Sequence, residues 1–322
     1  MDFLSPRANR LLLLAAIACV AVAPFVVYPI FLMKLMCLAL MAAAVNLLVG
    51  WVGLLSFGHA MFYGAAGYVT AHALKVWGFD AVTGILAGVG VAVVIGLVSG
   101  MLAIRRQGIY FSMITLAFAQ LVSFIALRMP FTGGEDGIQD VPRPSVLGLF
   151  SLQDTMVLYY FVAVLVGLGF WLIHRVVHSP FGQVLGAIRD NEPRAQSLGY
   201  RVLRYKLLAF VLSAALAGLA GSLKVMVFQI ASLTDVHWAT SGEALLICIV
   251  GGMSTLMGPV LGALVIVTME NYLVSFAEWV LIIQGAVFVV VVMLFRKGIA
   301  GQFYAWLAAR RERGGQAAGA GG

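Results

Sequence analysis

The stretch that decides the fold is LMCLALMAAAVNLLVGWVGLLSFGHAMFYGAAGYVTAHAL, Leu35 to Leu74, which holds no Asp, Glu, Lys or Arg. A helix that crosses a membrane needs about 20 predominantly apolar residues. This stretch is therefore long enough for two crossings. The glycines between Gly50 and Gly58 predict where the first crossing is interrupted and the second begins.

The rest of the chain has the same character. Of its 322 residues, 62% are hydrophobic and only 10% are charged, whereas about 25% charged residues is usual in a soluble domain. We therefore predict an all-α polytopic membrane bundle with about ten transmembrane segments (eight to ten), of which one or two are re-entrant. The expected crossings are Leu11–Met33, two within Leu35–Leu74, Ala81–Ile104, Gln107–Leu127, Thr155–Ile173, Leu207–Leu223, two within Ala244–Phe276, and Trp279–Phe295.

The basic residues indicate the orientation, because Lys and Arg collect in cytoplasmic loops. With ten crossings and a cytoplasmic N-terminus, 15 of the 20 Lys and Arg residues face the cytoplasm. We therefore predict that both termini lie inside. The expected organisation is a cytoplasmic N-terminus (1–10), a single transmembrane domain (11–300) with a cytoplasmic segment (178–200), and a cytoplasmic, partly disordered tail (301–322).

Common catalytic and metal-binding motifs are missing. The sequence has no G-x-x-x-x-G-K-[ST] phosphate loop, no H-E-x-x-H and no C-x-x-C. Cys19, Cys37 and Cys248 lie inside apolar runs, where we interpret them as packing residues. We therefore expect no catalytic residue and no metal site on this chain. We also expect no nucleic-acid partner, because the positive charge of the chain is explained by topology.

The segment 178–200 is neither a simple loop nor a crossing. Ser179-Pro180 predicts a helix start, since a serine hydroxyl caps free amides and proline fits the first helical position. Phe181, Val184, Leu185 and Ile188 then recur at helical spacing and form one apolar stripe. Pro193 ends this helix or starts another, and Gly199 is a plausible C-cap. On pattern alone, such a helix either lies on the lipid interface or docks in a groove of a cytoplasmic partner.

Five stretches together resemble the permeases of binding-protein-dependent ABC transporters, in particular the branched-chain amino-acid permease family (LivM type). They are His178–Tyr200, Asn46–Ala60, Gly108–Phe118, Lys206–Gly221 and Gly251–Pro259. The general Glu-Ala-Ala loop motif of permeases is absent, and the loop carries only the subfamily's version, Ala187–Glu192.

The resemblance implies a permease subunit of an ATP-driven importer in the bacterial inner membrane. Its implied partners are a second, different permease chain, two cytoplasmic ATPases and a periplasmic substrate-binding protein. This chain would carry no cofactor of its own, and ATP with Mg would be bound by the partner ATPases. The implied ATPase-coupling residues are Ser179, Pro180, Phe181, Gly182, Val184, Leu185, Ile188, Arg189 and Glu192.

A path for a zwitterion needs polar groups that face the interior of the bundle. The candidates for a translocation path are Asn46, Ser56, His59, Tyr110, Ser112, Thr115 and Gln120. For each of them, a bond to a helix carbonyl or a close helix contact is the structural alternative. The expected substrates are branched-chain or other small amino acids. Urea or short amides are the alternative, and an ion-coupled secondary transporter or a membrane enzyme is a further one.

Overall fold

The structure of the chain is a computed structural model that describes residues 20–146, 148, 150–273, 282–283, 285–286, 288–289, 293 and 298–302. The predicted N-terminus (1–10), most of the Trp279–Phe295 crossing and the tail beyond residue 302 lie outside these residues.

Five described helices are long and apolar enough to cross a membrane by length and composition. They are α2 with its π-helical continuation η1 (Pro29–Asn46 and Leu47–Val52), α4 (Ala81–Ala103), α5 (Ile109–Arg128), α6 (Thr155–Val177) and α9 (Val202–Phe228). The predicted helical membrane bundle is thus confirmed, whereas the count of about ten crossings and the orientation stay predictions.

The remaining described elements are shorter. The helices are α3 (His59–Lys75), the 3-10 turn η2 (Pro130–Thr132), α7 (Pro180–Asp190), α8 (Glu192–Ser197), α10 (Leu233–Val236), α11 (Trp238–Gly251) and α12 (Gly258–Leu273). Two strands, β1 (Ser145–Val146) and β2 (Phe150–Ser151), form a minimal antiparallel hairpin in register Ser145↔Ser151 and Val146↔Phe150. Within the described part of the chain, the prediction of an all-α fold therefore misses this hairpin and one isolated β-bridge, Ile138↔Ala231.

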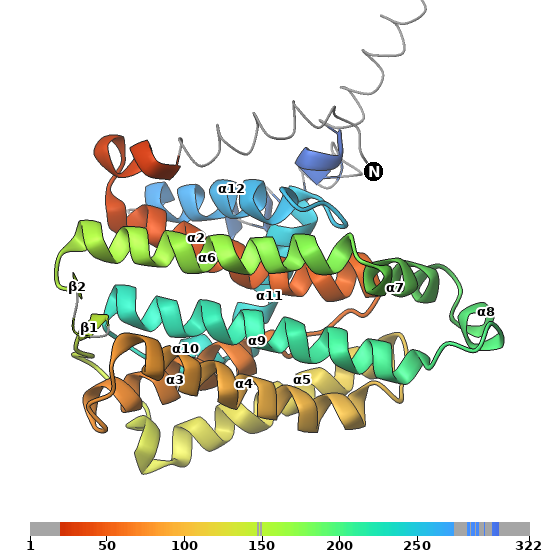
Figure 1. Cartoon of the computed structure of the whole chain (residues 1–322), viewed down its shortest axis with the longest axis horizontal. Helices are drawn as coiled ribbons and strands as arrows, with labels where there is room; N and C mark the ends of the chain where they lie inside the picture. Colours follow the sequence, from red (N-terminus) through yellow and green to blue (C-terminus); the bar gives the residue numbers. More distant parts are fainter. Residues whose placement is uncertain are drawn as a thin grey trace, which may run out of the picture.

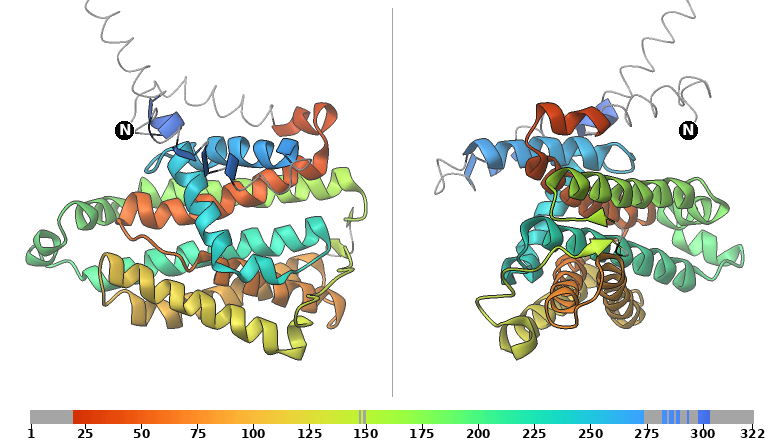
Figure 2. Two further views of the ribbon diagram at one scale, coloured as in Figure 1. Left: turned by 180° about the vertical axis from the view of Figure 1, so that it is seen from behind. Right: turned by 60° about the vertical axis from the view of Figure 1, so that its left-hand side comes forward.

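Helix α9 lies between two groups of helices. Figures 1 and 2 both show α2, α6 and α12 on one side of it and α3, α4 and α5 on the other. The α7–α8 pair projects from one end of the bundle, and the β1–β2 hairpin lies at the opposite end (Figure 1). Polar loops therefore lie at both ends of an apolar body.

Close backbone contact joins α3 to α9. A Cβ atom on Gly221 of α9 would overlap the carbonyl oxygen of Tyr63 on α3. Near the same contact, Thr70 Oγ1 donates a hydrogen bond of 2.8 Å to Ser222 Oγ. Lipid provides little hydrophobic drive for helix association, so small residues that let backbones approach and polar groups that bond between helices stabilise such a pair.

The first expected crossing is wrong at its C-terminal boundary. A helix that includes residues 20–26 ends there, and α2 begins at Pro29, which sits in its first turn. Proline favours this position because its missing N–H would have no helical partner there. Lys34 consequently lies within α2 and not between crossings, and its Nζ lies 3.0 Å from Glu270 Oε2 on α12.

Arg143 holds the loop between α5 and α6 against the bundle. Its Nε donates to the Met226 carbonyl (3.0 Å) and its Nη2 to the Val227 carbonyl (2.7 Å), both at the end of α9. The backbones of Ile138 and Ala231 also pair. Partial burial lowers the pKa of Arg143, because it removes water from the charged group. The loop is thus attached to the carbonyls that α9 leaves free at its C-terminus.

Candidate functional site: the α7–α8 segment and the helix interruptions

The predicted helix start at Ser179-Pro180 is confirmed. Ser179 Oγ accepts a hydrogen bond from the Gly182 amide at 3.4 Å and donates one to the Val176 carbonyl at 2.6 Å. The serine thus caps α7 and also bonds to the last turn of α6. This double role fixes the direction in which α7 leaves the bundle.

Helix α8 begins and ends with local capping motifs. Asn191 Oδ1 accepts from the Arg194 amide at 3.0 Å, and Pro193 lies in the first turn, so Pro193 starts a new helix. Gly199 has φ +89°, and its amide donates to the Gln196 carbonyl while the next amide donates to the Ala195 carbonyl. These two bonds form a Schellman motif, which confirms Gly199 as the C-cap.

The apolar stripe of α7 faces the protein itself. Leu185 and Ile188 are buried, and the ring of Phe181 stacks on Tyr205 of α9 at a centroid distance of 5.5 Å. Val184 packs beside Ile188. The expectation that this stripe is the docking ridge for a partner is therefore wrong at Leu185 and Ile188, because other residues of the same chain already cover these two side chains.

The outward side of the segment carries polar and small apolar residues. The exposed residues of α7 that make no described contact with the bundle are Pro180, Gln183, Ala187 and Asp190. Of the residues predicted to couple to an ATPase, only Pro180 and Arg189 are exposed. Contact of the segment with an ATPase stays a prediction, and it concerns this outward side.

A buried ion pair joins α8 to α9. Lys206 Nζ lies 2.5 Å from Glu192 Oε2, and the two side chains are only 3% and 16% exposed. The pairing explains how α9 extends to Val202, well before the expected start at Leu207. A carboxylate at this distance compensates the lysine charge, so the helix continues through Lys206 without leaving a charge unpaired.

Arg189 points inward from α7 to the two helix interruptions. Its Nη1 donates to the Gly50 carbonyl in η1 at 2.6 Å and to Ser254 Oγ at 3.2 Å. Ser254 lies in the turn between α11 and α12. The glycine-rich stretches near Gly50 and Gly251, which the sequence marked as breaks in apparently continuous crossings, thus lie side by side in space.

Asn46 links the same two breaks. Its Nδ2 donates to the Thr255 carbonyl at 2.8 Å, and its Oδ1 accepts from the Ser254 amide at 3.1 Å. Both polar atoms of the amide are therefore bonded to the α11–α12 turn. This arrangement supports the structural alternative for Asn46 over direct contact with a transported molecule.

Three other path candidates meet at the interruption before α3. Ser112 Oγ on α5 donates to the Leu55 carbonyl at 2.7 Å, and Thr115 Oγ1 accepts from the Phe57 amide at 3.2 Å. Ser56 Oγ accepts from the Gly58 amide at 3.2 Å. The hydroxyls thus bond to backbone groups that the interrupted helix would otherwise leave without partners.

His59 connects three helices at the start of α3. Its Nε2 lies 2.8 Å from Ser213 Oγ on α9, and Ser213 donates its own proton to the Ala44 carbonyl of α2. A serine hydroxyl has a single proton, so His59 is the donor to Ser213 and Nε2 carries hydrogen. His59 therefore acts here as a buried connection between helices.

Tyr110 and Gln120 do not face the interior of the bundle. Tyr110 is 72% exposed, and Gln120 is also exposed, on the outward face of α5. The expectation that both side chains point inward is wrong, because other residues form the buried face of α5, among them Ser112, Thr115 and Ala119. If Tyr110 or Gln120 contacts a transported molecule, that molecule lies on the outer surface of this chain and not inside its bundle.

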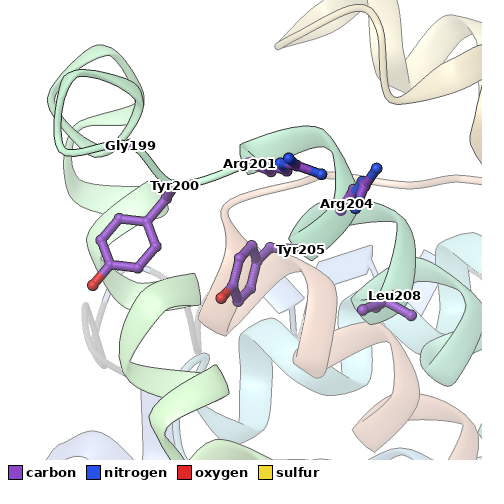
Figure 3. Close-up of a pocket in the computed structure, with 6 residues that line it drawn as sticks. All are labelled: Gly199, Tyr200, Arg201, Arg204, Tyr205 and Leu208. Carbon is purple, nitrogen blue, oxygen red and sulfur yellow. The ribbon is translucent and has the colours of Figure 1, made fainter.

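A hollow of about 460 Å³ lies where α8 meets α9. Figure 3 shows its wall, in which Arg201 and Arg204 lie next to each other and the rings of Tyr200 and Tyr205 face the same space. The lining residues are Gly199, Tyr200, Arg201, Arg204, Tyr205 and Leu208. No acidic side chain is among them, so the hollow is basic and aromatic.

These features define a helical, multi-pass membrane protein with interrupted helices and a two-helix arm between α6 and α9. The chain belongs to the family described as "Branched-chain amino acid transport system / permease component", whose profile matches residues 28–292. Members of this family are membrane permease components of ABC transporters and are not themselves catalytic.

Curated relatives agree with this family. The chain is 29% identical over 288 residues to the high-affinity branched-chain amino acid transport system permease protein LivM of Escherichia coli (strain K12), covering 81% of this chain and 67% of the relative. It is 29% identical over 217 residues to the autoinducer 2 import system permease protein LsrC of Klebsiella pneumoniae, covering 62% and 58% of the two chains. It is 28% identical over 204 residues to the ribose import permease protein RbsC of Bacillus subtilis, covering 56% and 58%. No solved structure matches the chain.

Proposed function

We propose that this chain is the permease subunit of an ATP-driven, binding-protein-dependent importer for branched-chain or other small amino acids. The observation that carries the proposal is the α7–α8 arm, which is capped at both ends, fixed to α9 by a buried ion pair and exposed on its outward side. A rigid arm of this kind can receive force from a soluble partner and pass it to the bundle.

The partners follow from the family. Two cytoplasmic ATPases that bind ATP with Mg would act on the arm, a periplasmic binding protein would deliver substrate, and a second permease chain would complete the path. The expected location is the bacterial inner membrane. Closure of the ATPases would then bias the helices between outward- and inward-open states.

A path between two permease chains fits the placement of the polar residues. Tyr110 and Gln120 lie on the outward face of α5, where a second chain would meet them. Ser112, Thr115 and His59 are engaged within this chain. We therefore place the polar contacts to substrate on the outward face of α5 and leave the buried hydroxyls a structural role.

The substrate class is supported by the extent of the similarity. Alignment to the LivM protein covers 81% of the chain, against 62% and 56% for the autoinducer 2 and ribose permeases. Urea or a short amide is the alternative within the same framework. An ion-coupled secondary transporter is the further alternative, and it is less favoured because the family and the curated relatives are transport-system permease components.

Uptake by the reconstituted complex tests the proposal. The permease pair, both ATPases and the binding protein are placed in liposomes and offered labelled leucine, valine, alanine, ribose and urea. The expected result is uptake of a small amino acid that requires hydrolysable ATP and is insensitive to ionophores. Uptake that persists without ATP and stops with an ionophore would contradict the proposal, and preferred uptake of urea would select the alternative substrate.

A further inference from the structure

The α2–η1 helix ends in carbonyls that need donors from elsewhere in the chain. The last carbonyls of a helix have no intrahelical partner, and Gly50 lies in the final turn before Val52. Ser254 Oγ donates to the Gly50 carbonyl at 2.8 Å, and Arg189 Nη1 donates to the same oxygen at 2.6 Å. One carbonyl is therefore the meeting point of η1, α7 and the α11–α12 turn.

Ser254 has a strained backbone that these contacts hold in place. It has φ +61°, in the left-handed region that non-glycine residues rarely adopt. Such a conformation persists only when its surroundings fix it, and it is found often at functional sites. Here the amide of Ser254 bonds to Asn46, and its hydroxyl contacts both Gly50 and Arg189.

The aliphatic part of Arg189 passes directly over Gly53. A Cβ on Gly53 would lie 2.9 Å from Arg189 Cγ and 3.7 Å from Arg189 Cβ. Gly53 itself has φ +78° and ends η1. No larger residue fits between the arginine and the interrupted helix, so α7 and η1 touch at this point without an intervening side chain.

The neighbouring carboxylate of Asp190 does not determine where the guanidinium of Arg189 lies. Asp190 Oδ1 lies 3.3 Å from Arg189 Nη2, but its side chain is 72% exposed. An exposed ion pair between neighbouring residues contributes little. The hydrogen bonds of Nη1 to Gly50 and Ser254 are therefore the contacts that determine where the guanidinium lies.

We propose that Arg189 is a positioning residue for coupling, which ties α7 to both helix interruptions so that a displacement of α7 moves η1 and the α11–α12 turn together. This inference rests on the proposed function, because it assigns a route for the force that an ATPase would apply to the arm. It gives Arg189 an inward task, distinct from contact with the ATPase.

The first test measures substrate taken up per ATP hydrolysed by the complete reconstituted complex. Arg189→Met keeps the length of the side chain and removes its donors, and it is expected to lower this ratio at least tenfold while ATP hydrolysis continues. Arg189→Lys keeps one donor and is expected to restore part of the ratio. Arg105→Met is the matched control, since Arg105 is exposed in the loop after α4 and lies outside the α7–α8 arm, and it is expected to match wild type.

Two outcomes would overturn the inference. One is a ratio for Arg189→Met within twofold of wild type. The other is loss of the ATPases from the purified Arg189→Met complex, which would assign Arg189 to docking or folding. A wild-type complex that takes up none of the offered compounds would instead overturn the proposed function, so the two failures are distinguishable.

A second test replaces the polar link with a covalent one. The 3.7 Å between the Cβ positions of residues 53 and 189 lies within the range of a disulfide. The double variant Gly53→Cys/Arg189→Cys is expected to be uncoupled when reduced and to regain at least half of the wild-type ratio when oxidised, whereas each single variant does not respond to oxidant. A disulfide that forms without recovery of the ratio would contradict the inference.

Discussion

The buried ion pair between Glu192 and Lys206 allows a quantitative prediction about the arm. The variant Glu192→Gln removes the negative charge and keeps the shape of the side chain. Lys206 is then left as a charge that is only 3% exposed, and no other carboxylate is recorded within ion-pair distance of its Nζ among the described residues. We expect the α8–α9 connection to open far more often in this variant.

The size of the effect follows from the burial of the pair. Removing one partner of a fully buried pair costs about 3–5 kcal/mol. Glu192 keeps some exposure, and glutamine still offers an oxygen, so the free energy of local opening should fall by about 2–3 kcal/mol. Since about 1.4 kcal/mol is a factor of ten, the open population should rise roughly 30- to 140-fold.

Limited trypsin digestion of the detergent-purified protein measures this opening. Arg194 and Arg201 flank the C-terminal half of the arm, and neither is removed by the substitution. When closing is faster than cleavage, the cleavage rate follows the open population. Mass spectrometry of the fragments then gives the ratio of the rates for variant and wild type.

The controls separate charge burial from general damage. Asp190→Asn removes a 72% exposed carboxylate and should change cleavage less than about fivefold, as expected for a surface pair. The double variant Glu192→Gln/Lys206→Met removes the unpaired charge and should return to within about fivefold of wild type. A cleavage rate for Glu192→Gln within threefold of the wild-type rate would refute the reasoning. So would a double variant that is cleaved as fast as Glu192→Gln alone.

Three further predictions concern packing. Gly221→Ala should lower the stability of the detergent-purified protein by about 2–3 kcal/mol in a thermal unfolding assay, because its Cβ meets a backbone carbonyl of α3; Gly90→Ala, which has open space around it, should be neutral or stabilising by up to about 1 kcal/mol. Ile188→Asp buries a carboxylate and should cost at least about 3 kcal/mol in the same assay, whereas the exposed Gln183→Asp should stay within about 0.5 kcal/mol; equal losses would contradict the inward orientation of the stripe. Arg143→Gln should weaken hydrogen-exchange protection of the loop before α6 by about 2–3 kcal/mol, since it removes bonds from a charged donor to two carbonyls.

Long apolar helices were predictable from runs without charge. The expected segments Ala81–Ile104 and Gln107–Leu127 differ from α4 and α5 by two residues at most. The caps of the arm could be predicted equally well, because a helix cap depends on residues only a few positions apart. The predicted span was shorter than α9, because the charge of Lys206 ends the apolar run. In the folded chain Glu192 pairs with that charge, so the helix continues through it.

The candidate site was predicted less completely. The sequence marked breaks near Gly50 and Gly251 but contained no sign that the two would meet. It marked Arg189 as part of a coupling helix, yet the periodicity of a helix does not tell which partner each face will contact. The pattern of α7 left both the lipid interface and a partner protein open, and only the family resemblance implied the partner, whereas in the structure α9 packs against the stripe.

The sequence by itself thus determined that the chain is a helical membrane bundle, where most of its apolar helices lie, and that a capped amphipathic segment follows α6. These properties depend on hydropathy and on hydrogen bonds between neighbours along the chain. Only the tertiary structure decided which face of α7 is buried, which carboxylate pairs with Lys206, and that Arg189 joins two distant helix breaks. These properties depend on distances between residues up to about 200 positions apart, which side-chain shape and charge select only once the helices are packed.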